Sequence, residues 1–131
     1  MPIFATAVWA PRALSLLRIV AALVFMEHGC GKLFGFPAWP AGGRPAVFEA
    51  EWFAGIIEGL GGLLLALGVF IRPVAFVMSG EMAIGYWTFH APKSFYPLLN
   101  GGDAAVLYCF VFLYIFVAGG GAWSVDRLRN D

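Results

Sequence analysis

Charged residues are scarce in this 131-residue chain, where Asp, Glu, Lys and Arg together make up 12% and apolar residues 61%. That charged share is about half of the share usual in soluble domains. A soluble domain of this size hides only about two-thirds of its surface on folding, so it still needs a polar coat. Eight basic and eight acidic side chains cannot supply that coat. The composition therefore excludes a soluble monomer, and its high mean hydropathy of +0.82 excludes a disordered chain.

The chain also has no excess of charge of either sign, because its eight Lys and Arg match its eight Asp and Glu. A protein that binds nucleic acid through the phosphate backbone needs a basic surface. A protein that steers a charged partner from a distance needs a net field. We therefore expect no nucleic-acid partner, and we expect the lipid bilayer as the main environment.

Cysteine is nearly absent, with Cys30 and Cys109 as the two examples and no C-x-x-C spacing. The two could meet as a redox pair if the helices that carry them are adjacent, but a free cysteine is also a common buried apolar residue. The segment HGCGK at 28–32 contains a histidine and a cysteine but has no established ligand spacing. We therefore expect no metal site.

Long apolar runs are what the sequence does contain. A membrane-spanning helix needs about 20 mainly apolar residues. Runs such as GGLLLALGVFI do not alternate with the period of two that a membrane barrel requires. The sequence predicts an all-α integral membrane protein with one domain over residues 1–131 and with spans at about 13–34, 53–71, 73–90 and 104–122.

Short connections rich in proline and glycine join these runs, and short connections make neighbouring helices antiparallel. We therefore expect an up-down-up-down four-helix transmembrane bundle. Basic residues favour the cytoplasmic side of a membrane. That rule favours cytoplasmic termini at 1–12 and 123–131, because Arg12, Arg72, Arg127 and Arg129 share one side and Lys32, Arg44 and Lys93 the other.

Ionisable residues inside the runs are costly in lipid and tend to face the interior of a bundle. At 100° per residue, Arg18, Phe25, Gly29 and Lys32 share one stripe with His28 beside it, whereas Glu27 points the other way. In the second run, Glu58 lies within the G-x-x-x-G pattern GIIEG, which allows close helix approach.

The third run contributes Glu81, and the fourth carries a stripe of Asp103, Leu107, Phe110 and Tyr114. We predict a shared chamber in the outer half of the bundle, with Glu58, Asp103, His28 and Lys32 as its catalytic groups. We also predict a structural ion pair between Arg18 and Glu81. The alternative is that Lys32 and Asp103 only reach to water at the rim and do no chemistry.

Five segments in order make the chain similar to the DoxX family. They are LLR at 16–18, HGCGKLFGF at 28–36, EGLGGLLLALGVFIRP at 58–73, NGGDAAVL at 100–107 and WSVDR at 123–127. The resemblance covers nearly the whole chain. Glu27 and Glu81 look like additions of this chain. The family's motif residues carry over to Arg18, His28, Gly29, Lys32, Glu58, Gly61, Gly62, Arg72, Gly101, Gly102, Asp103 and Asp126.

The resemblance implies a small multi-pass protein of a prokaryotic cytoplasmic (inner) membrane. DoxX relatives include subunits of thiosulfate:quinone oxidoreductases and partners of soluble enzymes in thiol and oxidative-stress defence. It thus implies an oxidoreductase complex subunit, a protein partner or homo-oligomer, and quinone as the ligand. A quinone ring needs apolar walls as well as proton donors. We expect Phe25, Phe110 and Tyr114 to form the apolar walls. The alternatives are a small-solute or proton-coupled transporter and a non-catalytic membrane anchor or scaffold for a soluble partner.

Overall fold

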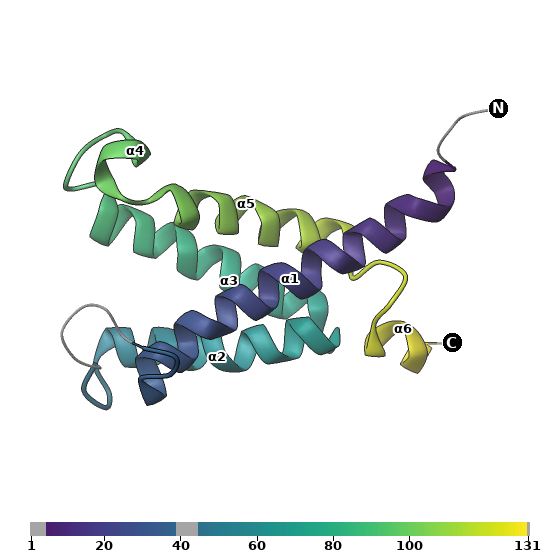
Figure 1. Cartoon of the computed structure of the whole chain (residues 1–131), viewed down its shortest axis with the longest axis horizontal. Helices are drawn as coiled ribbons and strands as arrows, with labels where there is room; N and C mark the ends of the chain where they lie inside the picture. Colours follow the sequence, from purple (N-terminus) through teal and green to yellow (C-terminus); the bar gives the residue numbers. More distant parts are fainter. Residues whose placement is uncertain (1–4, 39–44, 131) are drawn as a thin grey trace.

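The computed structural model describes residues 5–38 and 45–130, and Figure 1 shows their arrangement. Arg44, which the orientation argument uses, lies outside the described residues. The part of the chain that the structure describes contains helices and no strand. The elements are α1 (Thr6–Phe34), α2 (Ala50–Leu67), α3 (Ile71–Gly85), the π-helical turn η1 (Tyr86–His90), α4 (Pro97–Asn100), α5 (Asp103–Ala118) and α6 (Val125–Asn130).

Glycine ends two of the long helices. Gly35 after α1 and Gly68 after α2 have φ values of 68° and 80°, and their N–H groups return to carbonyls of the last turn. Only glycine adopts this left-handed conformation without steric cost, so both helices end at these residues. The expectation that the fourth apolar run is helical to residue 122 is wrong. A run of three glycines follows α5 at Ala118, and both Gly119 and Gly121 have positive φ.

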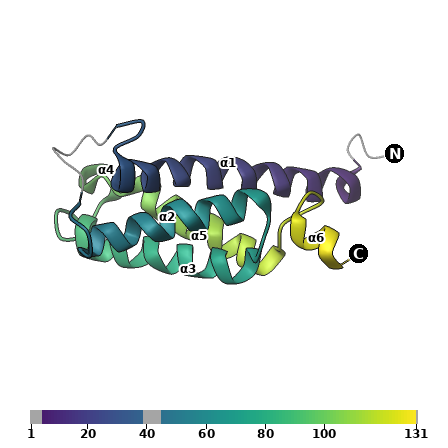
Figure 2. The same ribbon diagram turned by 90° about the horizontal axis from the view of Figure 1, so that it is seen from below.

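The long helices pack mainly as two pairs, α1 with α2 and α3 with α5 (Figures 1 and 2). The contact between α1 and α2 is made by glycines. A Cβ built on Gly29 would collide with the backbone of Gly59, and one on Gly62 would lie 2.8 Å from the Cβ of Met26. The close approach that the G-x-x-x-G pattern predicts is therefore confirmed, since any side chain at Gly29 would push the helices apart.

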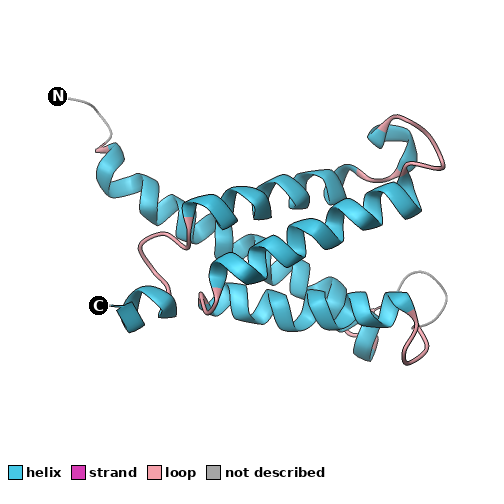
Figure 3. Cartoon of the chain, turned by 180° about the vertical axis from the view of Figure 1, so that it is seen from behind, coloured by secondary structure: helices cyan, strands magenta, loops and turns pink. Residues whose placement is uncertain are grey.

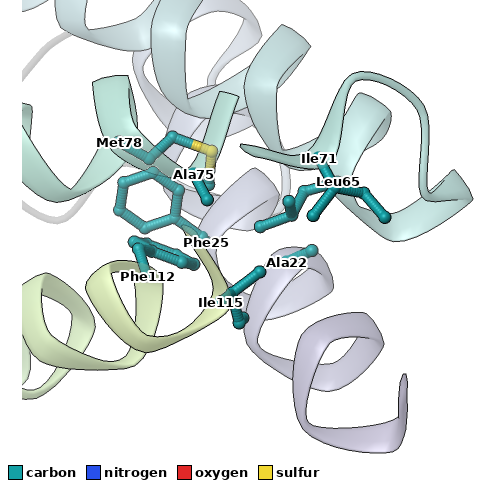
Figure 4. Packing of buried hydrophobic residues seen from close by; sticks show 8 residues of the cluster. All are labelled: Ala22, Phe25, Leu65, Ile71, Ala75, Met78, Phe112 and Ile115. Carbon is teal, nitrogen blue, oxygen red and sulfur yellow. The ribbon is translucent and has the colours of Figure 1, made fainter. Parts of the chain in front are cut away.

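The buried core lies where the two pairs meet. Phe25 of α1 and Phe112 of α5 pack with their ring centroids 4.9 Å apart. Each long helix contributes to the cluster, which Figure 4 shows from close by. Its members are Ala22, Phe25, Leu65, Ile71, Ala75, Met78, Phe112 and Ile115.

Large apolar side chains also cover the outside of the helices, including Val20 at 57% exposed, Ile84 at 67% and Val117 at 68%. Soluble monomers rarely expose apolar patches of this extent. The helices α1 and α2 are long and apolar enough to cross a bilayer, α5 is a shorter apolar helix, and α3 continues into η1. The described part of the chain is therefore helical, with the outward apolar surface that is typical of a membrane protein.

Candidate functional site

An ion pair joins the end of α1 to the middle of α2. Lys32 Nζ lies 2.6 Å from Glu58 Oε2 and 3.2 Å from Glu51 Oε2. The Lys32 side chain is 11% exposed and that of Glu58 only 2%. Glu51 and Glu58 are seven residues apart, which is about two helical turns and places both on the face of α2 that Lys32 meets. Lys32 is therefore held between two carboxylates.

The glycine contact between α1 and α2 creates this geometry. Gly55 lies so close to α1 that a Cβ there would be 3.0 Å from the Cβ of Lys32. With the backbones this near, the Lys32 side chain reaches Glu58 without leaving the interior. Burial of the carboxylate is tolerated because a cation sits within hydrogen-bonding distance. The same glycines that pack the helices thus hold the charged pair.

The predicted pairing of Arg18 with Glu81 is wrong. The guanidinium of Arg18 donates hydrogen bonds to three backbone carbonyls, those of Leu65 at 2.9 Å, Trp123 at 2.6 Å and Gly120. Arg18 is only 1% exposed, and these acceptors satisfy its buried charge through backbone dipoles instead of a carboxylate. Arg18 therefore ties α2 and the segment after α5 to α1.

Glu81 of α3 lies instead near the Lys32 cluster, within electrostatic range of both Glu58 and Lys32. Its Oε2 is buried and has no hydrogen-bond partner among the described residues. A charged carboxylate that is buried without a donor is costly. Glu81 therefore adds a second, partly buried carboxyl group from α3 beside the Lys32–Glu58 pair of α1 and α2.

A cavity of about 280 Å³ lies beside this cluster, between α1 and α5. One side is polar and includes Lys32 and Glu58. The other is aromatic, since the rings of Phe25 and Tyr108 have centroids 5.1 Å apart. The exposed lining residue His28 places one edge of the cavity at the surface. The lining residues are Phe25, His28, Lys32, Glu51, Glu58, Met82, His90, Gly101, Ala104, Ala105 and Tyr108.

One end of the cavity is formed by η1 and the segment that follows it. The ring Nδ1 of His90, the last residue of η1, lies 3.0 Å from the carbonyl oxygen of Asn100. Asn100 is buried and also donates to Tyr86 at 3.1 Å and to the Ser94 carbonyl at 2.9 Å. This hydrogen-bonded corner fixes where α5 begins relative to α3.

The structure brings together four of the predicted site residues, namely His28, Lys32, Glu58 and Phe25. It does not bring Asp103, Phe110 and Tyr114 to them. Asp103 is exposed and does not line the cavity, and Phe110 and Tyr114 are 63% and 58% exposed. The predicted inward stripe of α5 is thus its outward face, and assigning these residues to a site in the interior is a mistake.

Two lining residues, Glu51 and Tyr108, are missing from the sequence prediction. The spacing of Glu51 and Glu58 by two helical turns would have signalled that they share a face. Tyr108 is partly buried and precedes the buried Phe112 and Ile115 at a spacing typical of one helix face. This spacing indicates the inward face of α5. The residues that start at Asp103 are spaced just as regularly, so periodicity alone does not distinguish the two faces.

The two cysteines are free and lie in different surroundings. Cys30 lines a shallow hollow on α1 together with Leu23 and Glu27. Cys109 faces α3, where the Ser79 hydroxyl lies 3.6 Å from its Sγ and donates to its carbonyl oxygen at 2.8 Å. The structure therefore gives no support to a redox pair of Cys30 and Cys109.

Comparison with known proteins adds three relationships. The family described as DoxX matches residues 13–91, which run from α1 through η1. An uncharacterized protein of Haemophilus influenzae (strain ATCC 51907 / DSM 11121 / KW20 / Rd) is 42% identical, across 91% of this chain and 92% of its own length. The inner membrane protein YphA of Escherichia coli (strain K12) is 30% identical, across 89% and 90%. No solved structure matches the chain significantly.

Proposed function

The chain belongs to the DoxX family, and we propose that it is an inner-membrane subunit of an oxidoreductase complex whose cavity between α1 and α5 takes a quinone. The observation that carries this proposal is the cavity itself, in which the buried Lys32–Glu58 pair faces the aromatic side chains of Phe25 and Tyr108. The inner membrane protein among its relatives supports the same location for this chain.

The cavity suits a quinone ring in size and in chemistry. Its volume of about 280 Å³ accommodates one substituted ring. Ligand pockets of about 300–1,000 Å³ are typical of whole drug-sized molecules, so an isoprenoid tail would lie outside, among the lipids. Phe25 and Tyr108 provide apolar walls for the ring, and Lys32 provides a donor for a quinone carbonyl.

Reduction of a quinone to a quinol consumes two electrons and two protons. We assign the two electrons to a donor of the thiosulfate or thiol class, two molecules of which are oxidised to one disulfide-linked product. The electrons reach the quinone directly or through a partner subunit. We assign delivery of the two protons to this chain. We assign the relay of these protons to Glu58, which lines the cavity, to the nearby Glu81, and to His28 at the exposed edge of the cavity.

The packing of the inner half favours binding over transport. The core residues Ala22, Leu65 and Ile115 are completely buried, and they lie on the Arg18 side of Phe25. The Arg18 hydrogen bonds to Leu65, Gly120 and Trp123 join the helices there. A transporter needs access from both aqueous phases to its site. The cavity beside Lys32 has its exposed edge on one side of this packed layer.

The proposal includes the arrangement in the bilayer. We place α1, α2, α3 with η1, and α5 across the membrane as an up-down-up-down four-helix bundle, which agrees with their alternating directions in Figure 1. The basic residues at the end where the termini lie favour the cytoplasm for that end. The Lys32 cavity then lies in the outer leaflet, where a lipid-soluble quinone diffuses.

Quinone binding to the purified chain tests the proposal. The full chain in lipid nanodiscs is titrated with ubiquinone-1 and, separately, menadione, with quenching of tryptophan fluorescence as the readout. We expect saturable binding that Glu58→Gln and Tyr108→Leu each weaken at least tenfold. Asp103→Asn is the matched control, because Asp103 is exposed outside the cavity, and it should change the affinity less than twofold.

Absence of saturable binding by the unaltered chain, or equal loss in the Asp103→Asn control, would overturn the proposal. Lipid extraction after purification in mild detergent gives an independent measurement. We expect endogenous quinone to co-purify with the unaltered chain and to be depleted in Glu58→Gln. Circular dichroism of each variant establishes that the helices are intact.

A further inference from the structure

A second and larger cavity lies at the opposite end of the bundle, the end at which α1 begins and α6 lies in Figures 1 and 2. Its volume is about 720 Å³. Its walls come from the start of α3, from the glycine segment after α5 and from α6. The proposed quinone site does not involve it.

Arginines from two separate elements face this cavity. Arg72 comes from the first turn of α3, and Arg127 and Arg129 come from α6. Among the described residues the lining contains one carboxylate, Asp126, which accepts hydrogen bonds from the backbone N–H groups of Phe70 at 3.1 Å and Ile71 at 3.0 Å. The cavity therefore carries an excess of positive charge.

The guanidinium groups are positioned by contacts that keep them at the cavity. Arg129 lies over the ring of Phe70, 5.5 Å from its centroid, and its Nη1 is 3.9 Å from Asp126 Oδ1. Arg72 lies against the glycine segment, where a Cβ on Gly119 would be 3.4 Å from its Nη2. Arg127 donates to the Ala122 carbonyl at 3.4 Å.

The glycine segment adds backbone donors to the same wall. Gly119, Gly120 and Gly121 all line the cavity. The N–H of Gly119 closes the last turn of α5 at 2.8 Å. The N–H groups of Gly120 and Gly121 have no acceptor among residues 5–38 and 45–130. Unpaired N–H groups beside guanidinium groups form a typical anion-binding surface.

We propose that this cavity binds a phosphate group. The planar guanidinium matches phosphate oxygens with two parallel hydrogen bonds, which makes arginine the usual residue for this ligand. The phosphate could belong to the head group of an anionic phospholipid or to a soluble phosphate compound. Basic pockets among membrane helices bind lipid head groups, and the apolar lining residues Leu14 and Pro73 would contact the glycerol and first methylenes.

The test uses the full chain in dodecyl maltoside with three probes: dioleoyl phosphatidylglycerol, dioleoylglycerol as the same lipid without phosphate, and inorganic phosphate against chloride at equal ionic strength. Binding is followed by native mass spectrometry and by the shift of the unfolding temperature. We expect phosphatidylglycerol or inorganic phosphate to bind, and dioleoylglycerol and chloride not to. Binding of phosphatidylglycerol alone identifies a lipid head group, and equal binding of inorganic phosphate identifies a soluble source.

Matched arginine variants localise the site. Arg72→Gln and Arg129→Gln should each weaken phosphate binding at least tenfold. Arg12→Gln is the matched control, because it removes one positive charge at the same end of the bundle. Arg12 lies 5.2 Å from the centroid of the Trp9 ring and does not line the cavity. This variant should change binding less than twofold. Arg129→Gln alters an exposed side chain of the short α6, so it keeps the test valid if Arg72→Gln fails to fold.

Two results would overturn the proposal. One is that neither phosphate probe binds better than its phosphate-free counterpart. The other is that Arg12→Gln weakens binding as much as Arg72→Gln and Arg129→Gln, which would indicate attraction to the general basic surface. Quinone binding is measured separately on the same variants, and we expect it to be unchanged, so failure of one proposal does not imply failure of the other.

Discussion

Lys32 of α1 and Glu58 of α2 form an ion pair of 2.6 Å, with only 2% of the Glu58 side chain exposed. The pair depends on the glycine contact of α1 with α2, which brings the two backbones together. Glu81 from α3 lies within electrostatic range of Glu58 and so links this pair to the second pair of helices. The cluster is therefore both the candidate site and a junction between three helices.

Loss of the cation should destabilise the protein. Lys32→Met leaves Glu58 buried without its partner, and breaking a buried pair on one side typically costs about 3–5 kcal/mol. We expect the double variant Lys32→Met with Glu58→Leu to recover most of that loss, because it removes both charges together. Chemical unfolding in detergent measures the free energy of unfolding of the unaltered chain and of both variants. A stable single variant would show that the pair contributes little to the fold.

The contact of Gly29 with Gly59 should tolerate no side chain. Gly29→Ala places a methyl group against the Gly59 backbone, and overpacking of this kind costs about 1–3 kcal/mol, occasionally more. Gly80→Ala is the matched control in α3, where a Cβ meets nothing within 4 Å. It should be neutral or stabilising. Thermal unfolding of the two variants side by side tests the contact, and equal melting temperatures would argue against it.

Removal of Arg18 should loosen the segment between α5 and α6. Arg18→Ala leaves the carbonyls of Leu65, Gly120 and Trp123 without their donor, and each unsatisfied buried group costs about 1–3 kcal/mol. We expect a loss of at least ~3 kcal/mol in unfolding free energy and faster hydrogen exchange at residues 120–123. Arg12→Ala, which removes a cation–π contact with Trp9 in the same helix, serves as the control. Unchanged exchange at 120–123 would contradict the assignment.

Asp126 should act as a cap for α3 from outside that helix. Its carboxylate accepts from the N–H groups of Phe70 and Ile71, and loss of such a cap costs about 0.5–2 kcal/mol. We expect Asp126→Ala to lower the melting temperature and Asp126→Asn, which keeps one acceptor oxygen, to lower it less. The reverse order would indicate that charge rather than hydrogen bonding is what Asp126 supplies.

Local sequence patterns predicted which faces of α1 and α2 are buried. On α1, the residues Arg18, Phe25 and Lys32 are buried or nearly so, and Glu27 is exposed, as helical periodicity predicts. That prediction succeeded because polar and small residues on α1 mark one face of an otherwise apolar helix. The same reasoning located the glycine face of α2. It failed on α5, where Asp103 is the only charged residue of an almost uniformly apolar helix and therefore cannot define an inward face.

The sequence by itself determined that this is an apolar, helical membrane chain with a polar stripe on α1 and a glycine face on α2, because composition and periodicity act within single helices. Only the tertiary structure decided the partners of Arg18, the facing of α5 and the approach of Glu81 to Glu58. Backbone carbonyls have no signature in the side-chain sequence. The rotation of a uniformly apolar helix is set by how its neighbours pack against it.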